Sequence, residues 1–156
     1  SATMKLNLRR VERIEEALAL ATELDRHAAQ FWAQFSDDPW PAGACERFLR
    51  QHFDARETVL VAALDGSRAA PWGVCLVGPL VDPLRGESLP TVLVLHVDPA
   101  LRHRGVAHEL IEEATKVLSA RGVERLAARV GHNDDALISM GERWGFVRSW
   151  GLMVRE

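Results

Sequence analysis

One stretch of the chain constrains its fold more than any other. A nearly continuous apolar run, Thr91 to Val97, is followed by a short turn and then by an amphipathic pattern from Val106 to Arg121. An apolar run of this kind is typical of a strand that is covered on both faces. The apolar residues after Gly105 recur at helical spacing, and Gly122 is suited to end the helix. A strand, a tight turn and a helix in this order predict an α/β fold.

The segments before this unit alternate between strand and helix patterns. Lys5 to Arg9 predicts a short strand, and the apolar spacing that begins at Val11 predicts a helix that continues towards Phe35. A second short helix is expected from Cys45 to Phe53. Two β-rich runs, Thr58 to Leu64 and Trp72 to Val77, are joined across Asp65-Gly66-Ser67 and predict a hairpin, and Pro79 to Pro90 predicts a loop.

The segments after residue 121 continue this α/β order. Arg125 to Val130 predicts a strand, and Asn133 or Asp134 is expected to cap a helix that ends at Gly145. Phe146 to Val154 predicts a final strand. The resulting expectation is an α/β order within a single domain of residues 4–156. Ser1-Ala2-Thr3 before Met4 is interpreted as the remnant of an expression tag.

Composition excludes several classes of function. The formal net charge of −3 argues against nucleic acid as a partner. No stretch approaches the roughly 20 apolar residues of a membrane span, and the N-terminus lacks a signal-peptide pattern, so we expect a cytoplasmic protein without a membrane partner. No set of His, Cys, Asp or Glu residues has the spacing of metal ligands, so no metal site is predicted.

The turn before the predicted helix Val106 to Arg121 has the chemistry of an anion site. It reads Arg102-His103-Arg104-Gly105-Val106-Ala107. The first N–H groups of a helix have no intrahelical partner, and the helix dipole adds partial positive charge there. Gly105 lets the backbone approach an anion closely, and Arg102 and Arg104 add positive charge. The turn therefore predicts a phosphate-binding site.

Two ordered motifs carry a resemblance to a known family. The turn has the spacing R-x-x-G-x-A, with Val97-x-Pro99 just upstream, and Asn133-x-x-Ala136 leads through a predicted helix to Gly145-Phe146. In this the chain resembles the GNAT superfamily of acyl-CoA-dependent N-acyltransferases, whose CoA-pyrophosphate loop reads Q/R-x-x-G-x-G/A after a strand that ends near V-x-P. The resemblance covers Leu89 to Glu156, and the N-terminal half carries no motif.

The resemblance implies a GNAT-like α/β fold with a mixed central sheet flanked by helices in a single domain. It also implies an enzyme that uses acetyl-CoA as cosubstrate and acetylates a primary amine by direct attack in a ternary complex. In the family a splayed or bulged fourth strand offers backbone groups to the pantetheine and to the acetyl carbonyl. An amide at the position of Asn133 usually lies near the CoA chain; a helix cap is an equally simple role for it. The residues expected to bind CoA are Leu95, His96, Val97, Arg102, His103, Arg104, Gly105, Val106, Ala107 and Asn133.

The general base is predicted to be His96, because it is the one ionisable group of its strand and titrates near neutrality when unperturbed. Alternation along the strand can instead point it to the opposite face as a hydrogen-bonded core histidine. His132 is a second candidate for the base.

The chain departs from the family pattern at the residue that protonates the leaving thiolate. Many members use a tyrosine in the last helix, and this chain contains no tyrosine. Ser139 is the nearest hydroxyl to that position and is therefore the candidate acid, with water as the alternative. The missing tyrosine also favours a second hypothesis, a non-catalytic acyl-CoA-binding module.

The acceptor pocket is expected in the N-terminal half. Trp32 and Trp40 belong to an aromatic group, and Asp37 and Asp38 lie between them, a combination that suits a protonated amine. A packed core and a solvated turn explain the same residues equally simply. The acceptor is expected to be a small-molecule or peptide amine, and its identity stays open, as does a homodimer.

Overall fold

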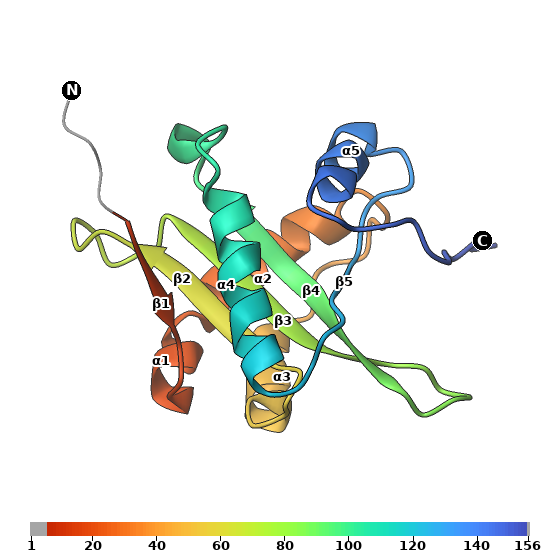
Figure 1. Ribbon diagram of the computed structural model, residues 1–156, viewed down its shortest axis with the longest axis horizontal. Helices are drawn as coiled ribbons and strands as arrows, with labels where there is room; N and C mark the ends of the chain where they lie inside the picture. The colour runs from red at the N-terminus through yellow and green to blue at the C-terminus, as the bar shows by residue number, and fades with distance from the viewer. Residues whose placement is uncertain (1–5, 156) are drawn as a thin grey trace.

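The fold is a five-stranded sheet with helices on both faces (Figure 1). The computed structural model describes residues 6–155, so the tag interpretation and Lys5 lie outside the described residues. Strands β1 to β4 pair antiparallel in chain order, and β5 pairs parallel with β4. This confirms the predicted mixed sheet. The strands are β1 (Asn7–Arg10), β2 (Val59–Leu64), β3 (Gly73–Val81), β4 (Ser88–Val97) and β5 (Ala127–Ala128).

Four of the helices cover the two faces of the sheet. One face carries α1 (Ile14–Ala19), α2 (Ala21–Trp32) and α3 (Ala44–His52), and the other carries α4 (Val106–Ala120). The fifth helix, α5 (Asp135–Arg143), lies beside the open end of β4 and β5. Within residues 6–155, no helix is both long enough and apolar enough to cross a membrane.

Alternation along the strands divides the core into two clusters. In β2, Val59, Val61 and Ala63 point towards α4, whereas Leu60 and Ala62 point towards α1, α2 and α3. The predicted apolar face of α4 is buried, with Leu110 and Ala114 fully enclosed. The strand pattern and the helix pattern therefore fix which side chains of each element face which layer.

The first predicted helix is interrupted. Leu20 donates its N–H to the carbonyl of Ala17, three residues back, which ends α1, and α2 begins at the next residue. The helical pattern also ends at Trp32 and not at Phe35, where a turn bonds Phe35 N–H to Trp32 O.

The prediction of a loop from Pro79 to Pro90 is wrong, because β3 and β4 continue through most of it to form a long hairpin. Asp82 N–H donates to Glu87 O at the tip, and from this pair hydrogen-bonded and non-hydrogen-bonded residue pairs alternate along the two strands. This places Pro79 opposite Pro90 at a non-hydrogen-bonded pair, where neither residue needs an N–H. Proline therefore does not break the ladder here.

The C-terminal prediction of a strand is also wrong. Residues 146–155 form no helix or strand, and Trp150 and Met153 are 70% and 100% exposed. A strand needs a neighbouring edge with free backbone groups. The predicted strand from Arg125 to Val130 is only the two-residue β5, which offers too short an edge for the apolar tail.

Candidate active site

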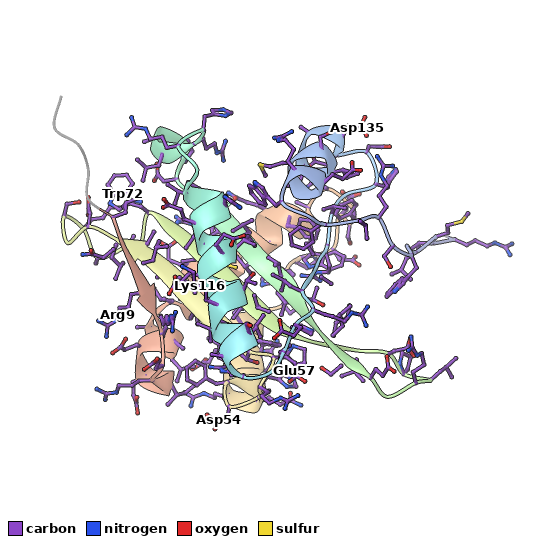
Figure 2. All side chains as sticks on the ribbon, in the orientation of Figure 1. Arg9, Asp54, Glu57, Trp72, Lys116 and Asp135 are labelled. Atoms are coloured by element: carbon purple, nitrogen blue, oxygen red, sulfur yellow. The ribbon has the colours of Figure 1, made fainter. Side chains whose placement is uncertain are left out.

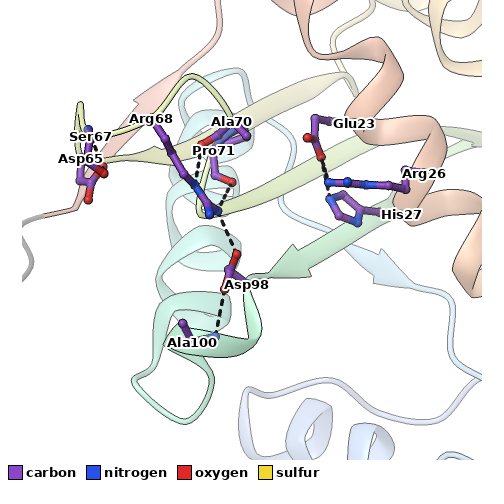
Figure 3. Close-up of polar contacts among 10 residues, drawn as sticks. All are labelled: Glu23, Arg26, His27, Asp65, Ser67, Arg68, Ala70, Pro71, Asp98 and Ala100. Carbon is purple, nitrogen blue, oxygen red and sulfur yellow. Dashed lines mark hydrogen bonds and ion pairs between the residues drawn. The ribbon is translucent and has the colours of Figure 1, made fainter.

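The turn that connects β4 to α4 is held by a contact from the loop that joins β2 to β3. Asp98 follows β4 and accepts from Ala100 N–H at 3.0 Å, which caps the short 3-10 helix Pro99–Leu101. Its other carboxylate oxygen accepts from Arg68 Nη2 at 2.9 Å (Figure 3). The Arg68 guanidinium lies 3.5 Å from the centroid of the Trp72 ring. Asp98, at the start of the turn, is thus held by Ala100 through one carboxylate oxygen and by Arg68 through the other.

The rest of the turn leads into a helix start with free donors. His103 and Gly105 both have positive φ, at 64° and 76°, and they redirect the chain into α4. Glu109 N–H donates to Gly105 O, so the N–H groups of residues 106–108 precede the first intrahelical bond. No side chain caps this end of α4.

The space around this helix start is open to an anion. A side-chain atom built on Gly105 meets nothing within 4 Å. Arg102, His103 and Arg104 are exposed beside it, and Val106 is buried and anchors the helix on the sheet. The geometry fits the pyrophosphate of CoA, because the free N–H groups and the helix dipole meet at this opening and the exposed Arg102 and Arg104 adjoin it in the chain.

Strands β4 and β5 separate after a short contact. Their register joins only Thr91 with Ala127 and Val92 with Ala128, and the β3–β4 register shifts at a bulge that leaves Leu93 unpaired. Asp98 N–H donates to Trp72 O on the β3 side. By alternation, the backbone groups of His96 also face β3, and those of Leu95 and Val97 face the gap. Two of the three predicted backbone positions therefore point into the opening between the strands.

The imidazole of His96 lies on the face that carries α2. Its ring stacks on the ring of His27 with centroids 3.5 Å apart and an interplanar angle of 12°. His27 Nε2 is 3.3 Å from Glu23 Oε2, and Glu23 also pairs with Arg26 on α2 (Figure 3). His27 Nδ1 is buried and has no hydrogen-bond partner among the described residues. His96 is half-buried, so it is neither a core histidine nor a freely exposed one.

Burial and charge keep His96 neutral. Desolvation, followed by the neighbouring His27 and Arg102, lowers the pKa of His96 to about 4. Desolvation also lowers the pKa of His27. The unperturbed titration near neutrality that the sequence indicated therefore does not hold. At neutral pH the His96 imidazole is therefore uncharged and able to accept a proton, although as a weaker base than an unperturbed histidine.

An apolar hollow of about 270 Å³ lies on the same face of the sheet as His96. Its walls come from α2, α3 and the bulged part of β4, and its one charged lining residue among those described is Arg129, just after β5. The lining residues are Ala28, Trp32, Trp40, Ala44, Cys45, Phe48, Leu76, Pro79, Leu93, Val94 and Arg129. The hollow thus reaches the strand that carries His96.

The walls of this hollow are braced by hydrogen bonds. Asp25 Oδ1 accepts from Trp40 Nε1 at 2.9 Å and from Cys45 N–H at 3.0 Å. Arg129 Nη2 donates to Leu93 O at 3.1 Å, the carbonyl of the bulged residue. The bulge and the aromatic wall are therefore both held by side chains that sequence patterns did not single out.

A larger hollow, of about 520 Å³, lies at the opposite end of the molecule. It is lined by the end of α4 and by residues 53–56, and Figure 2 places Asp54 and Glu57 far from Asp135 of α5. The guanidinium of Arg121 donates there to the carbonyls of Arg56 and Thr58. This hollow is remote from His96 and from the turn at Gly105.

The remaining predicted residues lie further from His96. Ser139 is exposed on α5, and Asn133 is exposed just before it, while Asp134 caps α5 by accepting from Leu137 N–H. Asp37 and Asp38 are exposed on a turn and do not line the hollow, whereas Trp32 and Trp40 do. Among residues 6–155, no three His, Cys, Asp or Glu residues are grouped as metal ligands.

Sequence reasoning missed four residues of this region: His27, Arg68, Asp98 and Arg129. His27 lies beside buried Ala28 on α2, so a histidine on the inner face of an amphipathic helix was the available signal. Arg129 is a charge within the predicted strand Arg125 to Val130. The Arg68–Asp98 contact spans 30 residues and has no local signal.

Comparison with solved structures shows a shared fold. The aminoglycoside N-acetyltransferase AAC(6')-Iy in complex with CoA gives a TM-score of 0.70 at 14% identity, covering 99% of this chain and 96% of that chain. The aminoglycoside acetyltransferase meta-AAC0020 from an uncultured soil metagenomic sample gives 0.66 at 16% identity, covering 97% and 94%. The ribosomal-protein-alanine N-acetyltransferase from Brucella melitensis biovar Abortus 2308 gives 0.60 at 16% identity, covering 97% and 99%.

Family-level comparison reaches further than these pairwise identities. A search of curated protein sequences gives no significant match. The model of the Acetyltransferase (GNAT) family matches residues 13–146, which include α2, the bulged β4, the turn at Gly105 and α5. This match extends the resemblance into the N-terminal half, which carried no motif. The chain belongs to the Acetyltransferase (GNAT) family and is an acetyl-CoA-dependent N-acetyltransferase.

Proposed function

We propose that the protein acetylates a primary amine by direct attack on acetyl-CoA while both substrates are bound. One observation carries this proposal. Neighbouring residues of β4 present a neutral imidazole, that of His96, to one face of the sheet, and the backbone groups of Leu95 and Val97 to the gap beside β5. An amine and a thioester that enter from these two sides meet at the same strand.

The gap between β4 and β5 and the turn at Gly105 support the proposed CoA-binding roles. The N–H groups at the start of α4, together with Arg102, His103 and Arg104, hold the pyrophosphate at the open side of Gly105. The backbone of Leu95 and Val97 pairs with the pantetheine and donates to the acetyl oxygen, an interaction commonly worth a factor of about 100 or more in rate. Asn133 is exposed just before α5, and we assign its amide to a contact with the CoA chain.

The proton transfers follow from the same arrangement. His96, directly or through a water, accepts the proton that the amine releases as its nitrogen bonds to the acetyl carbon and the carbon–sulfur bond breaks. The departing thiolate takes a proton from water or from Ser139, and a thiol with an ordinary pKa of about 8.5 is a tolerable leaving group. Acetyl-amide and CoA thiol are the products.

The cysteines support direct attack over a covalent acyl-enzyme. Cys45 lines the hollow, and burial together with Asp25 raises the pKa of its thiol to about 12. Cys75 is fully buried, and burial raises its pKa to about 12 as well. Neither thiol supplies the thiolate that a nucleophile of this kind needs.

Two-substrate kinetics test the proposal. Thiol release from acetyl-CoA is measured with a panel of primary amines, and the initial rates are expected to give intersecting lines when both concentrations vary, with no burst in the absence of amine. Cys45→Ala is expected to keep the rate within about tenfold. A burst that Cys45→Ala removes would establish an acyl-enzyme instead. Binding of acetyl-CoA without thiol release for any amine would favour a non-catalytic acyl-CoA-binding module.

A further inference from the structure

Arg129 is a charged side chain that the fold places in an apolar setting. Its guanidinium lies 5.3 Å from the centroid of the Trp32 ring and 5.6 Å from that of Phe31. Burial alone lowers its pKa, and no carboxylate in residues 6–155 forms an ion pair with it. Arginines that are withdrawn from water are ordinarily paired with an anion.

The hydrogen bonds of Arg129 leave most of its donors free. Nη2 donates to Leu93 O, and Nε is buried without a partner among the described residues. A guanidinium offers five donors in a planar fork that matches the two oxygens of a carboxylate. Arg129 lines the hollow, and Nε is its one nitrogen in the described structure that is enclosed without a partner, so the unused donors on its Nη atoms are open to a molecule bound there.

The hollow also connects to the proposed reaction centre. Val94 lines it, and His96 lies two residues further along the same face of β4, roughly 7 Å away along the strand. On α2, Ala28 lines the hollow next to His27, which stacks on His96. A molecule that fills the hollow therefore extends along β4 towards His96.

We infer that this hollow binds the acceptor and selects primary amines that also carry a carboxylate, as amino acids and short peptides do. The inference rests on the proposed function, because it takes His96 as the point where the amine reacts. The carboxylate pairs with Arg129, and the aromatic walls of Trp32, Trp40 and Phe48 cover the intervening carbon atoms. Polycationic amines are disfavoured, because they bring like charge to an unpaired guanidinium.

Matched amines test this selectivity. Lysine, lysinamide and cadaverine share the same side-chain amine. Lysine also carries a carboxylate, lysinamide carries a neutral amide in its place, and cadaverine carries neither. We expect kcat/KM to be about 10 to 100 times higher for lysine than for lysinamide, the range for one hydrogen-bonded charge pair. Ethanolamine with O-phosphoethanolamine forms a second pair, and a preference for the phosphate ester over lysine would overturn the carboxylate assignment. Equal rates for all three lysine compounds would overturn the inference and leave acetyl transfer intact.

A variant separates binding from structure. Arg129→Met keeps an unbranched apolar stem against Phe31 and Trp32, and we expect it to reduce the lysine to lysinamide ratio of kcat/KM to about one, with a larger loss of rate for lysine than for cadaverine. Arg125→Met is the matched control, because Arg125 is exposed in the same segment. An equal loss for all three amines would mean that Arg129 only supports the bulge at Leu93. That result would overturn the inference.

A binding measurement keeps the test independent of turnover. N-acetylglycine and its amide are titrated into the wild-type protein, and calorimetry or the fluorescence of Trp32 and Trp40 reports occupancy of the hollow. We expect the acid to bind at least about tenfold more tightly than the amide, and Arg129→Met to remove the difference. Absence of turnover with preserved acid selectivity would count against the proposed reaction alone. Absence of acid selectivity would overturn the inference.

Discussion

The imidazole rings of His27 and His96 stack face to face, with centroids 3.5 Å apart. This contact joins α2, which forms one wall of the hollow, to β4, which carries the free backbone groups at the gap. It also places two titratable rings where protonation of one opposes protonation of the other. The acid–base behaviour of His96 is therefore a property of the pair.

Replacing His27 tests this coupling. In His27→Gln the desolvating ring and the potential positive charge beside His96 are both removed, and we expect the pKa of His96 to rise from about 4 towards its usual value of about 6.5. An NMR titration of the His96 ring measures the shift. The Gln side chain retains helix propensity in α2. An unchanged pKa would mean that burial against other groups alone keeps His96 neutral.

Removal of the imidazole of His96 tests its role as base. We expect His96→Ala to lower the acetylation rate by about two to four powers of ten, the usual range for a lost general base. In the wild-type protein, kcat/KM should fall as pH decreases through about 4, because protonation of His96 removes the acceptor, and the variant should lack this limb. His132→Ala, at an exposed position, serves as the control. A variant with wild-type rate and pH dependence would shift the role to His132 or to water.

An acidic side chain at Gly105 should block CoA. Gly105→Asp introduces a negative charge at the start of α4, where the pyrophosphate is proposed to approach, and we expect binding of CoA to be lost in calorimetry while the fold persists in a thermal melt. Gly86→Asp is the matched control, because Gly86 also has positive φ and open space but lies at the tip of the β3–β4 hairpin. CoA affinity that survives in folded Gly105→Asp would remove the turn from the cofactor site.

The contact between Arg68 and Asp98 should influence CoA binding without touching CoA. In Arg68→Ala the turn loses a hydrogen-bonded ion pair and the stacking on Trp72, so we expect KM for acetyl-CoA to rise about 3- to 30-fold with kcat changed less. Arg85→Ala is the control, because Arg85 pairs with Glu87 on the remote hairpin. Equal effects in the two variants would show that the clamp does not position the turn.

The absence of tyrosine gives a prediction for Ser139. Because this hydroxyl is exposed on α5 and bonds to no described group, it is a weak candidate for an acid. We expect Ser139→Ala to reduce the rate by less than about tenfold and to leave CoA affinity unchanged. The alkaline side of the pH–rate profile should lack a limb near the tyrosine pKa of about 10. A hundredfold loss of rate would establish Ser139 as the acid for the thiolate.

Local sequence patterns correctly predicted the elements that depend only on residues a few positions apart in the chain. The buried face of α4, the strand before it and the positive-φ turn at Gly105 follow from periodicity and from the conformational freedom of glycine. Patterns failed where pairing decides the outcome. Pro79 and Pro90 lie in a ladder because they face each other at a non-hydrogen-bonded pair, and the apolar tail after Phe146 is no strand because the neighbouring β5 is an edge of only two residues.

The sequence by itself determined the family-like order of strand, turn and helix, the turn proposed to bind CoA and the candidate base His96, because each depends on near neighbours in the chain. Only the tertiary structure decided the chemistry around that base. The stacking of His27 and the lowered pKa of His96 depend on the packing of α2 against β4. The hollow beside Arg129 and the clamp between Arg68 and Asp98 join segments distant in the chain. Burial and electrostatic interactions depend on distance in space, which local spacing does not encode.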